Sequence, residues 1–141
     1  MESQLRRIVR ERSLSLERDA PVGDAIAAVR NFTPVEGGAE VYYVYVTDEG
    51  RLVGVVSLRE LLNAEDDAPL SDVMNSDPVR VTVTDRPGIV ARRIVNSGFP
   101  VLPVVEGDEQ FLGIVRANDV IDALDEETTK ALFKQAGFWM R

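Results

Sequence analysis

The sequence contains no cysteine and no histidine among its 141 residues. Disulfides, thiolate or imidazole metal sites, and catalysis by a cysteine or a Ser-His-Asp triad are therefore excluded. Any bound metal would have to be a hard cation on oxygen ligands, such as Mg²⁺ or Ca²⁺. No apolar run approaches the roughly 20 residues that span a bilayer, and the N-terminus lacks the apolar stretch of a secretory signal. We therefore expect a cytoplasmic chain.

Basic residues are in the minority, 16 against 24 acidic residues, which gives a formal net charge of −8. Nucleic acid is therefore not expected as a partner. The acidity is typical of a solvated surface or of a protein that senses cations, and both interpretations stay open. Acidic clusters at 65–67, at Asp85 and at 122–127 lack the spacing of a preformed metal cage. With no nucleophile–base pair and no Walker-type loop either, we expect no enzymatic activity and name no metal ligand.

A β-hairpin pattern lies near the centre of the chain. Two apolar, β-branched and aromatic runs flank a polar turn at 48–50, which predicts a hairpin over residues 41–57. The second run leads into Ser57 and Glu60, which have the spacing of a capping box. We therefore expect a helix from Leu58 to about Ala64.

The remaining elements are predicted from similar patterns of apolar residues, turns and caps. Helices are expected over 3–12, from Pro21 to the loop at 33–38, as one turn at 70–74 capped by Ser71, from Pro87 to Gly98, over 117–124 and over 126–135. Strands are expected over 14–18, 79–83, 101–105 and 111–115, with Pro103 marking an edge strand.

The hairpin and its helix occur twice. Gly54 and Gly113 are 59 positions apart (113 minus 54), and the same offset places Glu60 on Asp119. A unit of about 60 residues is marginal alone, so two units are expected to share a core. The prediction is an α/β (α+β) fold of two pseudo-twofold-related β-α-β-β-α repeats packed sheet to sheet, with short N- and C-terminal helices. The expected boundaries are 1–13 for the N-terminal helix, 14–75 and 76–126 for the repeats, and 127–141 for the C-terminal helix or linker.

Three motifs carry a resemblance to a known family. They are the 99–105 segment Phe-Pro-Val-Leu-Pro-Val-Val, the 70–74 segment Leu-Ser-Asp-Val-Met, and the glycine-to-acid endings at 54–60 and 113–119. Together with the repeat, they resemble a tandem CBS domain pair, or Bateman module. The resemblance covers about residues 14–126 and implies a regulatory module.

A narrower likeness points to the cytosolic CBS pair of MgtE-type magnesium channels. It rests on segments 41–46, 54–61 and 71–75. That likeness implies a homodimer formed through the CBS repeats beneath a membrane-embedded magnesium pore, with Mg²⁺ sensed between domains and ATP bound in some members. The chain departs from the pattern at Arg86, Gly88 and Gly98, where such pairs tend to be acidic. This departure weakens the expectation that Mg²⁺ is sensed.

The resemblance also implies where a ligand would bind. In similar clefts, an aspartate at the start of the second repeat's last helix accepts both ribose hydroxyls of an adenine nucleotide such as ATP, ADP or AMP. Asp119 holds that position. Tyr43 and Phe99 match positions that stack on adenine, and Arg59 matches one that meets the phosphates.

Three further residues complete the expected nucleotide site. Pro100 and its neighbour Val101 are expected at a rigid cleft wall whose backbone groups read the adenine edge. Arg116 departs from the family pattern, which has Thr or Ser there to contact phosphate. Arg116 could donate to phosphate instead, or it could fill the cleft.

Each assignment has a structural alternative. A helix cap accounts for Ser57 and Glu60, so the first-repeat cleft is expected to be the poorer site. Asp119 could be an acid favoured by the helix dipole, and Tyr43 and Phe99 could simply pack against the core. Three functions therefore stay open: an adenine-nucleotide sensor coupled to a magnesium channel, a Mg²⁺-sensing gate without nucleotide, and a structural dimerisation module with empty clefts.

Overall fold

The computed structural model describes residues 5–11, 13–32 and 43–124, which form two compact units. The first-repeat unit holds residues 13–32, 43–78 and 108–111, and the second-repeat unit holds 5–11, 79–107 and 112–124. The expected loop at 33–38 and the expected helix at 126–135 lie outside the described residues. Within the described residues, no helix combines the length and the apolar character needed to cross a membrane.

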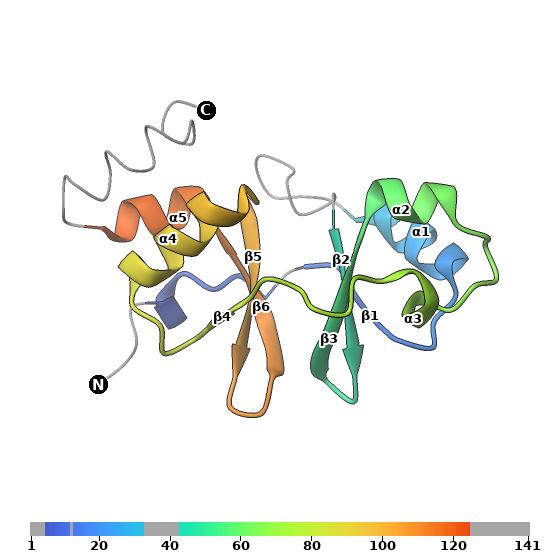
Figure 1. The fold of residues 1–141 in the computed structure, drawn as a ribbon, viewed down its shortest axis with the longest axis horizontal. Coiled ribbons are helices and arrows are strands. Elements are labelled where there is room, and N and C mark those ends of the chain that lie inside the picture. Colours follow the sequence, from blue (N-terminus) through green and yellow to red (C-terminus); the bar gives the residue numbers. More distant parts are fainter. Residues whose placement is uncertain (1–4, 12, 33–42, 125–141) are drawn as a thin grey trace. The chain divides into compact units, whose positions relative to one another are not determined.

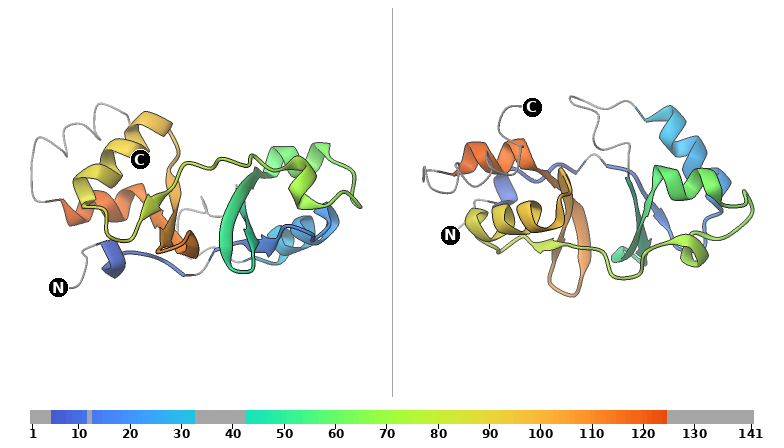
Figure 2. Two further views of the ribbon diagram at one scale, coloured as in Figure 1. Left: turned by 60° about the horizontal axis from the view of Figure 1, so that its bottom comes forward. Right: turned by 45° about the horizontal axis from the view of Figure 1, so that its top comes forward.

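The first-repeat unit combines a small sheet with helices. Its elements are β1 (Ser15–Glu17), α1 (Val22–Asn31), β2 (Tyr43–Asp48), β3 (Arg51–Ser57), α2 (Leu58–Asn63) and α3 (Leu70–Val73). Strand β2 pairs with β1 in parallel and with β3 in antiparallel fashion. Helices α1 and α2 lie side by side in every view (Figures 1 and 2). The hairpin turn places Glu49 and Gly50 at positive φ, which matches the twist of a two-residue hairpin.

The second-repeat unit has the same strand-helix-strand-strand-helix order, preceded by a short helix instead of followed by one. Its elements are η1, a 3₁₀ helix (Leu5–Arg7), β4 (Val81–Thr82), α4 (Pro87–Ser97), β5 (Val101–Glu106), β6 (Gln110–Arg116) and α5 (Ala117–Ala123). Strand β5 lies between β4 and β6, and β4 runs parallel to it. Helices α4 and α5 lie side by side (Figure 1). The mixed α/β fold predicted from the sequence is confirmed.

The repeat seen in the sequence is present in the secondary structure. Strand β6 has the bounds of β3 shifted by 59 positions, and α5 begins 59 positions after α2. Helix α4 begins 65 positions after α1. The same local sequence pattern therefore forms the same strand-to-helix junction twice.

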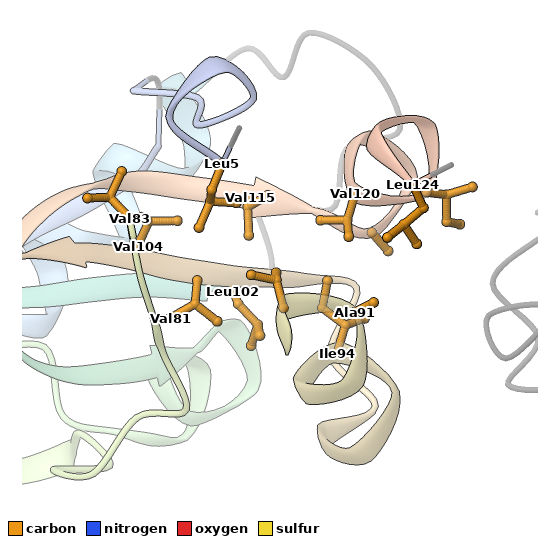
Figure 3. Packing of buried hydrophobic residues seen from close by; sticks show 13 residues of the cluster. Leu5, Val81, Val83, Ala91, Ile94, Leu102, Val104, Val115, Val120 and Leu124 are labelled. Atoms are coloured by element: carbon orange, nitrogen blue, oxygen red, sulfur yellow. The ribbon is translucent and has the colours of Figure 1, made fainter. Parts of the chain in front are cut away.

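Each unit has its own apolar core. In the second-repeat unit, Leu5 from the start of the chain is fully buried beside Val115 of β6, and Val120 of α5 and Ile94 of α4 complete the layer (Figure 3). The first-repeat core contains Val44, Val46, Val56, Leu61 and Leu70 among others. Full burial of a Val or Leu side chain contributes about 1.5–3 kcal/mol, so Leu5 ties the chain's first described residues to the second repeat.

Two expected helix features are wrong. The helix expected over 3–12 is reduced to η1, because Arg10 pairs its backbone with Ile114 and the chain must be extended there. Helix α3 is not capped by Ser71. It begins at the fully buried Leu70 after Pro69, because the Leu70 N–H donates to the Ala20 carbonyl at 2.9 Å.

Two expected strand features also need correction. The strand predicted over 79–83 is paired only at β4, since the Asp85 carboxylate accepts the Thr82 N–H at 2.9 Å and turns the chain toward α4. Pro103 does not lie on an edge strand, because β5 has neighbours on both sides. It is tolerated because the paired β4 residues face Val104 and Val105, the two positions after it.

Candidate functional site

The junction between β6 and α5 presents the carboxylate that the sequence singled out. Asp119 is the third residue of α5, and its side chain is 20% exposed. The Arg10 guanidinium donates from Nε to Asp119 Oδ2 at 2.9 Å and from Nη2 to Asp119 Oδ1 at 3.4 Å. Both carboxylate oxygens therefore have a cationic donor from the N-terminal segment.

The backbone of Arg10 is held in place as firmly as its side chain. Its N–H donates to the Ile114 carbonyl at 2.8 Å, and the Ile114 N–H donates back to the Arg10 carbonyl at 2.9 Å. This approach requires Gly113, because a Cβ there would lie 2.2 Å from the Arg10 carbonyl oxygen and the φ of this glycine is +154°. Sequence reasoning missed Arg10. The 65-residue offset could have indicated it, because it places Arg10 on Asn75, which forms the same bridge to Val55.

The loop before β5 carries the residue expected to stack on adenine. Helix α4 ends at Gly98 in the left-handed conformation, and the Phe99 N–H then donates to Ser97 Oγ at 3.2 Å. The Phe99 side chain remains substantially exposed. The Pro100 carbonyl accepts the Ala117 N–H at 2.9 Å, which attaches this loop to the first residue of α5.

Val101 and Arg116 are both buried. Val101 is the first residue of β5 and is enclosed by its unit. Arg116 is the residue before α5 and is 8% exposed. It supplies no side-chain cap to the helix, unlike the serine at the equivalent place in the first repeat.

That equivalent place is the junction between β3 and α2, where the predicted capping box is confirmed. The Glu60 N–H donates to Ser57 Oγ at 3.1 Å, and the Ser57 N–H donates to Glu60 Oε1 at 2.9 Å. The Glu60 carboxylate therefore binds its own helix start.

Tyr43 and Arg59 lie in the first-repeat unit, whereas the other five predicted site residues lie in the second-repeat unit. Tyr43 begins β2 opposite Ser57, and burial raises the pKa of its phenol above the ordinary value. Arg59 is the second residue of α2 and is exposed. Within the second-repeat unit, the structure brings the Phe99–Pro100 loop and Arg116 to the α5 start that carries Asp119.

Carboxylates do not gather into a metal site in the part of the chain that the structure describes. No group of three or more Asp or Glu residues there could hold a metal ion. Asp85 accepts the Thr82 N–H and lies 3.9 Å from the Arg93 guanidinium. Asp85 thus serves a turn and lies near a cation.

Comparison with known proteins identifies the repeat. A family model described as the CBS domain matches residues 5–67 and again residues 70–126. The magnesium transporters MgtE of Enterococcus faecalis and Thermus thermophilus are each 41% identical to the chain, over 98 and 95 residues, or 69% and 67% of its length. The chain spans only 22% and 21% of those two proteins.

A solved structure agrees with these matches. It is the crystal structure of the cytosolic domain of the Mg²⁺ channel MgtE in complex with ATP, which is 31% identical and superposes with a TM-score of 0.71. The match covers 83% of this chain and 47% of the other. The CBS pair predicted from sequence motifs, with a likeness to that of MgtE, is confirmed.

Proposed function

Since the chain belongs to the CBS domain family, we propose that it is a non-catalytic regulatory module that binds an adenine nucleotide, ATP, ADP or AMP. The residue that carries the proposal is Asp119. Its carboxylate lies at the start of α5, is partly exposed, and is joined through Ala117 and Pro100 to the loop that bears Phe99. A carboxylate can accept two hydrogen bonds from a ribose diol, and such charge-assisted bonds contribute about 1.5–3 kcal/mol each.

The other contacts follow from the chemistry of the remaining candidates. Phe99 and Tyr43 would stack on the base, at about 1–3 kcal/mol for each stacked ring. Arg59 would meet the phosphates, and Arg116 would add positive charge. Pro100 and Val101 would offer backbone groups to the adenine edge. The likeness to an MgtE cytosolic domain in complex with ATP supports this proposal.

The likeness to MgtE also supports a proposal about the assembly. The module would form a homodimer through its CBS repeats and regulate a membrane-embedded magnesium pore. Nucleotide, together with Mg²⁺, would shift the equilibrium between two packings of the dimer. The size of that shift is set by how much more tightly the ligand binds one packing than the other. Light scattering of the purified chain with and without millimolar Mg²⁺ measures both the dimer and its response.

Calorimetric titration with ATP, ADP and AMP, with and without Mg²⁺, tests nucleotide binding. Asp119→Asn keeps the side-chain size but weakens the acceptor, so we expect affinity to fall at least about tenfold, by the loss of one charge-assisted bond. Glu60→Gln is the matched control, because its carboxylate is engaged by the capping box. It should change affinity by less than about threefold.

The titration also separates the other two functions. Binding heat from Mg²⁺ alone, with none from any nucleotide, would favour a metal-gated domain and overturn the nucleotide site. No heat from either ligand, in a chain that still dimerises, would favour a structural module. An unchanged nucleotide affinity in Asp119→Asn would show that the nucleotide binds elsewhere.

A further inference from the structure

The Arg10 guanidinium and a ribose diol present the same arrangement of donors. Arg10 uses two N–H groups, one to each oxygen of Asp119. A vicinal diol likewise offers two donors on neighbouring atoms, and it would bind the two oxygens in the same bidentate manner. The two oxygens of one carboxylate cannot accept the pair of guanidinium N–H groups and the pair of ribose hydroxyls in the same bidentate position at once. The proposed ribose acceptor is therefore occupied by a residue of its own unit.

The occupation depends on a tether that stays in place when the side chain moves. Two backbone hydrogen bonds to Ile114 and the burial of Leu5 hold the segment around Arg10. The guanidinium is consequently presented to Asp119 at a high local concentration. If it were displaced, it would remain within one side-chain length of the ligand, where a phosphate would attract it.

The first repeat lacks this arrangement and serves as an internal contrast. Asn75 forms the bridge there to Val55, at 2.9 and 3.1 Å, and it carries no charge. The nearby Glu60 is held by the Ser57 backbone instead. An arginine on the crossing segment is thus a feature of the second repeat alone among the described residues.

We propose that Arg10 competes with the ribose for Asp119 and thereby makes the site select phosphorylated adenine nucleotides over the nucleoside. The inference rests on the proposed function. Adenosine must displace the guanidinium without compensation, whereas AMP or ATP displaces it and then offers it a phosphate. Arg10 is accordingly a specificity-determining residue, and the N-terminal segment is part of the ligand site.

Titration of the intact chain with adenosine and AMP tests the proposal. Arg10→Ala should raise the affinity for adenosine about five- to tenfold, because the competing guanidinium is gone. The affinity for AMP should rise less, so the preference for AMP over adenosine should fall. Arg10→Gln keeps most of the side chain's length and should act in the same direction if the alanine variant folds poorly. Arg6→Ala removes another ion pair of the same segment, to Glu106, and should leave both affinities unchanged.

A salt series provides an independent readout. Adenosine is uncharged, so salt acts on its affinity only through the Arg10–Asp119 pair. Raising NaCl from about 0.05 to about 0.5 M should screen this pair and raise the affinity of the native chain for adenosine. The same change should leave the affinity of Arg10→Ala for adenosine unaltered. Adenosine affinity that is unchanged or weaker in both Arg10 variants overturns competition, even where Asp119→Asn still loses AMP and the proposed function stands. If neither adenosine nor AMP binds to the native chain or to any variant, both the competition by Arg10 and the proposed nucleotide-binding function are overturned.

Discussion

The two strand-to-helix junctions place a carboxylate at the same position and use it differently. At α2, Ser57 and Glu60 satisfy each other in a capping box. At α5, Arg116 replaces the serine and the shorter Asp119 takes a partner from a distant segment. The two junctions thus differ both in the residue before the helix and in the length of the acid, and only the α2 carboxylate binds its own helix start. Divergence at these two positions accompanies the difference between a structural junction and a candidate binding junction.

Both junctions also share a glycine that a neighbouring segment crosses, and this contact is the most sensitive to substitution. At Gly113, a Cβ would meet the Arg10 backbone, and the φ of +154° is itself unfavourable for an L-residue. We expect Gly113→Ala to lower the free energy of unfolding by about 3–4 kcal/mol, through strain and overpacking. Chemical denaturation monitored by circular dichroism measures it.

Gly54→Ala is the matched variant, because a Cβ there would meet the flexible Met74 side chain first and would lie 3.0 Å from the Asn75 carbonyl oxygen. Its expected cost is about 1–2 kcal/mol, since the thioether can move aside. Equal costs at the two glycines would contradict the expected difference, which is that the overlap at Gly113 is with backbone whereas the closest overlap at Gly54 is with a side chain that can move.

A medium effect is expected at the cap itself. Ser57→Ala removes one half of the capping box and should cost about 1 kcal/mol of stability. The bond lost is the one that the Glu60 N–H donates to Ser57 Oγ, and the bond from the Ser57 N–H to the Glu60 carboxylate can remain. Urea denaturation of the variant beside Ser71→Ala provides the comparison, because Ser71 does not cap α3 and its loss should change stability by less than about 0.5 kcal/mol. A cost at Ser71 that matched the one at Ser57 would show that the box contributes nothing special.

The sequence predicts much of each junction, because its signals there are local. A capping box spans four residues, and the offset of 59 aligns β3 with β6 and α2 with α5. The position of Asp119 follows from that alignment. The partner of Asp119 does not follow, since an ion pair between residues 109 positions apart leaves no periodic trace.

The errors in element boundaries have the same origin. Ser71 has the residue type of a cap, but burial of Leu70 and its bond to Ala20 start the helix earlier. Val79 continues the apolar alternation, yet it is 40% exposed and precedes β4, whose pairing with β5 begins at Val81. At Leu70 a tertiary contact overrides a local preference, and at Val79 the local pattern continues beyond the residues that pair with a neighbouring strand.

The smallest predicted difference between the repeats concerns pH. The Glu17 carboxylate accepts from the Thr47 hydroxyl and from the Glu49 N–H, and these bonds hold the pKa of Glu17 below its ordinary value. A carboxyl whose pKa is lower in the folded state stabilises the fold above its unfolded pKa of about 4.5, and this contribution disappears as pH falls through the folded value. The position 65 residues later is Thr82, which cannot titrate in this range. Urea denaturation at pH 7 and near pH 3 should therefore show Glu17→Gln slightly less stable than the native chain at neutral pH, with the gap narrowing in acid. A gap that widened in acid would contradict the assigned direction.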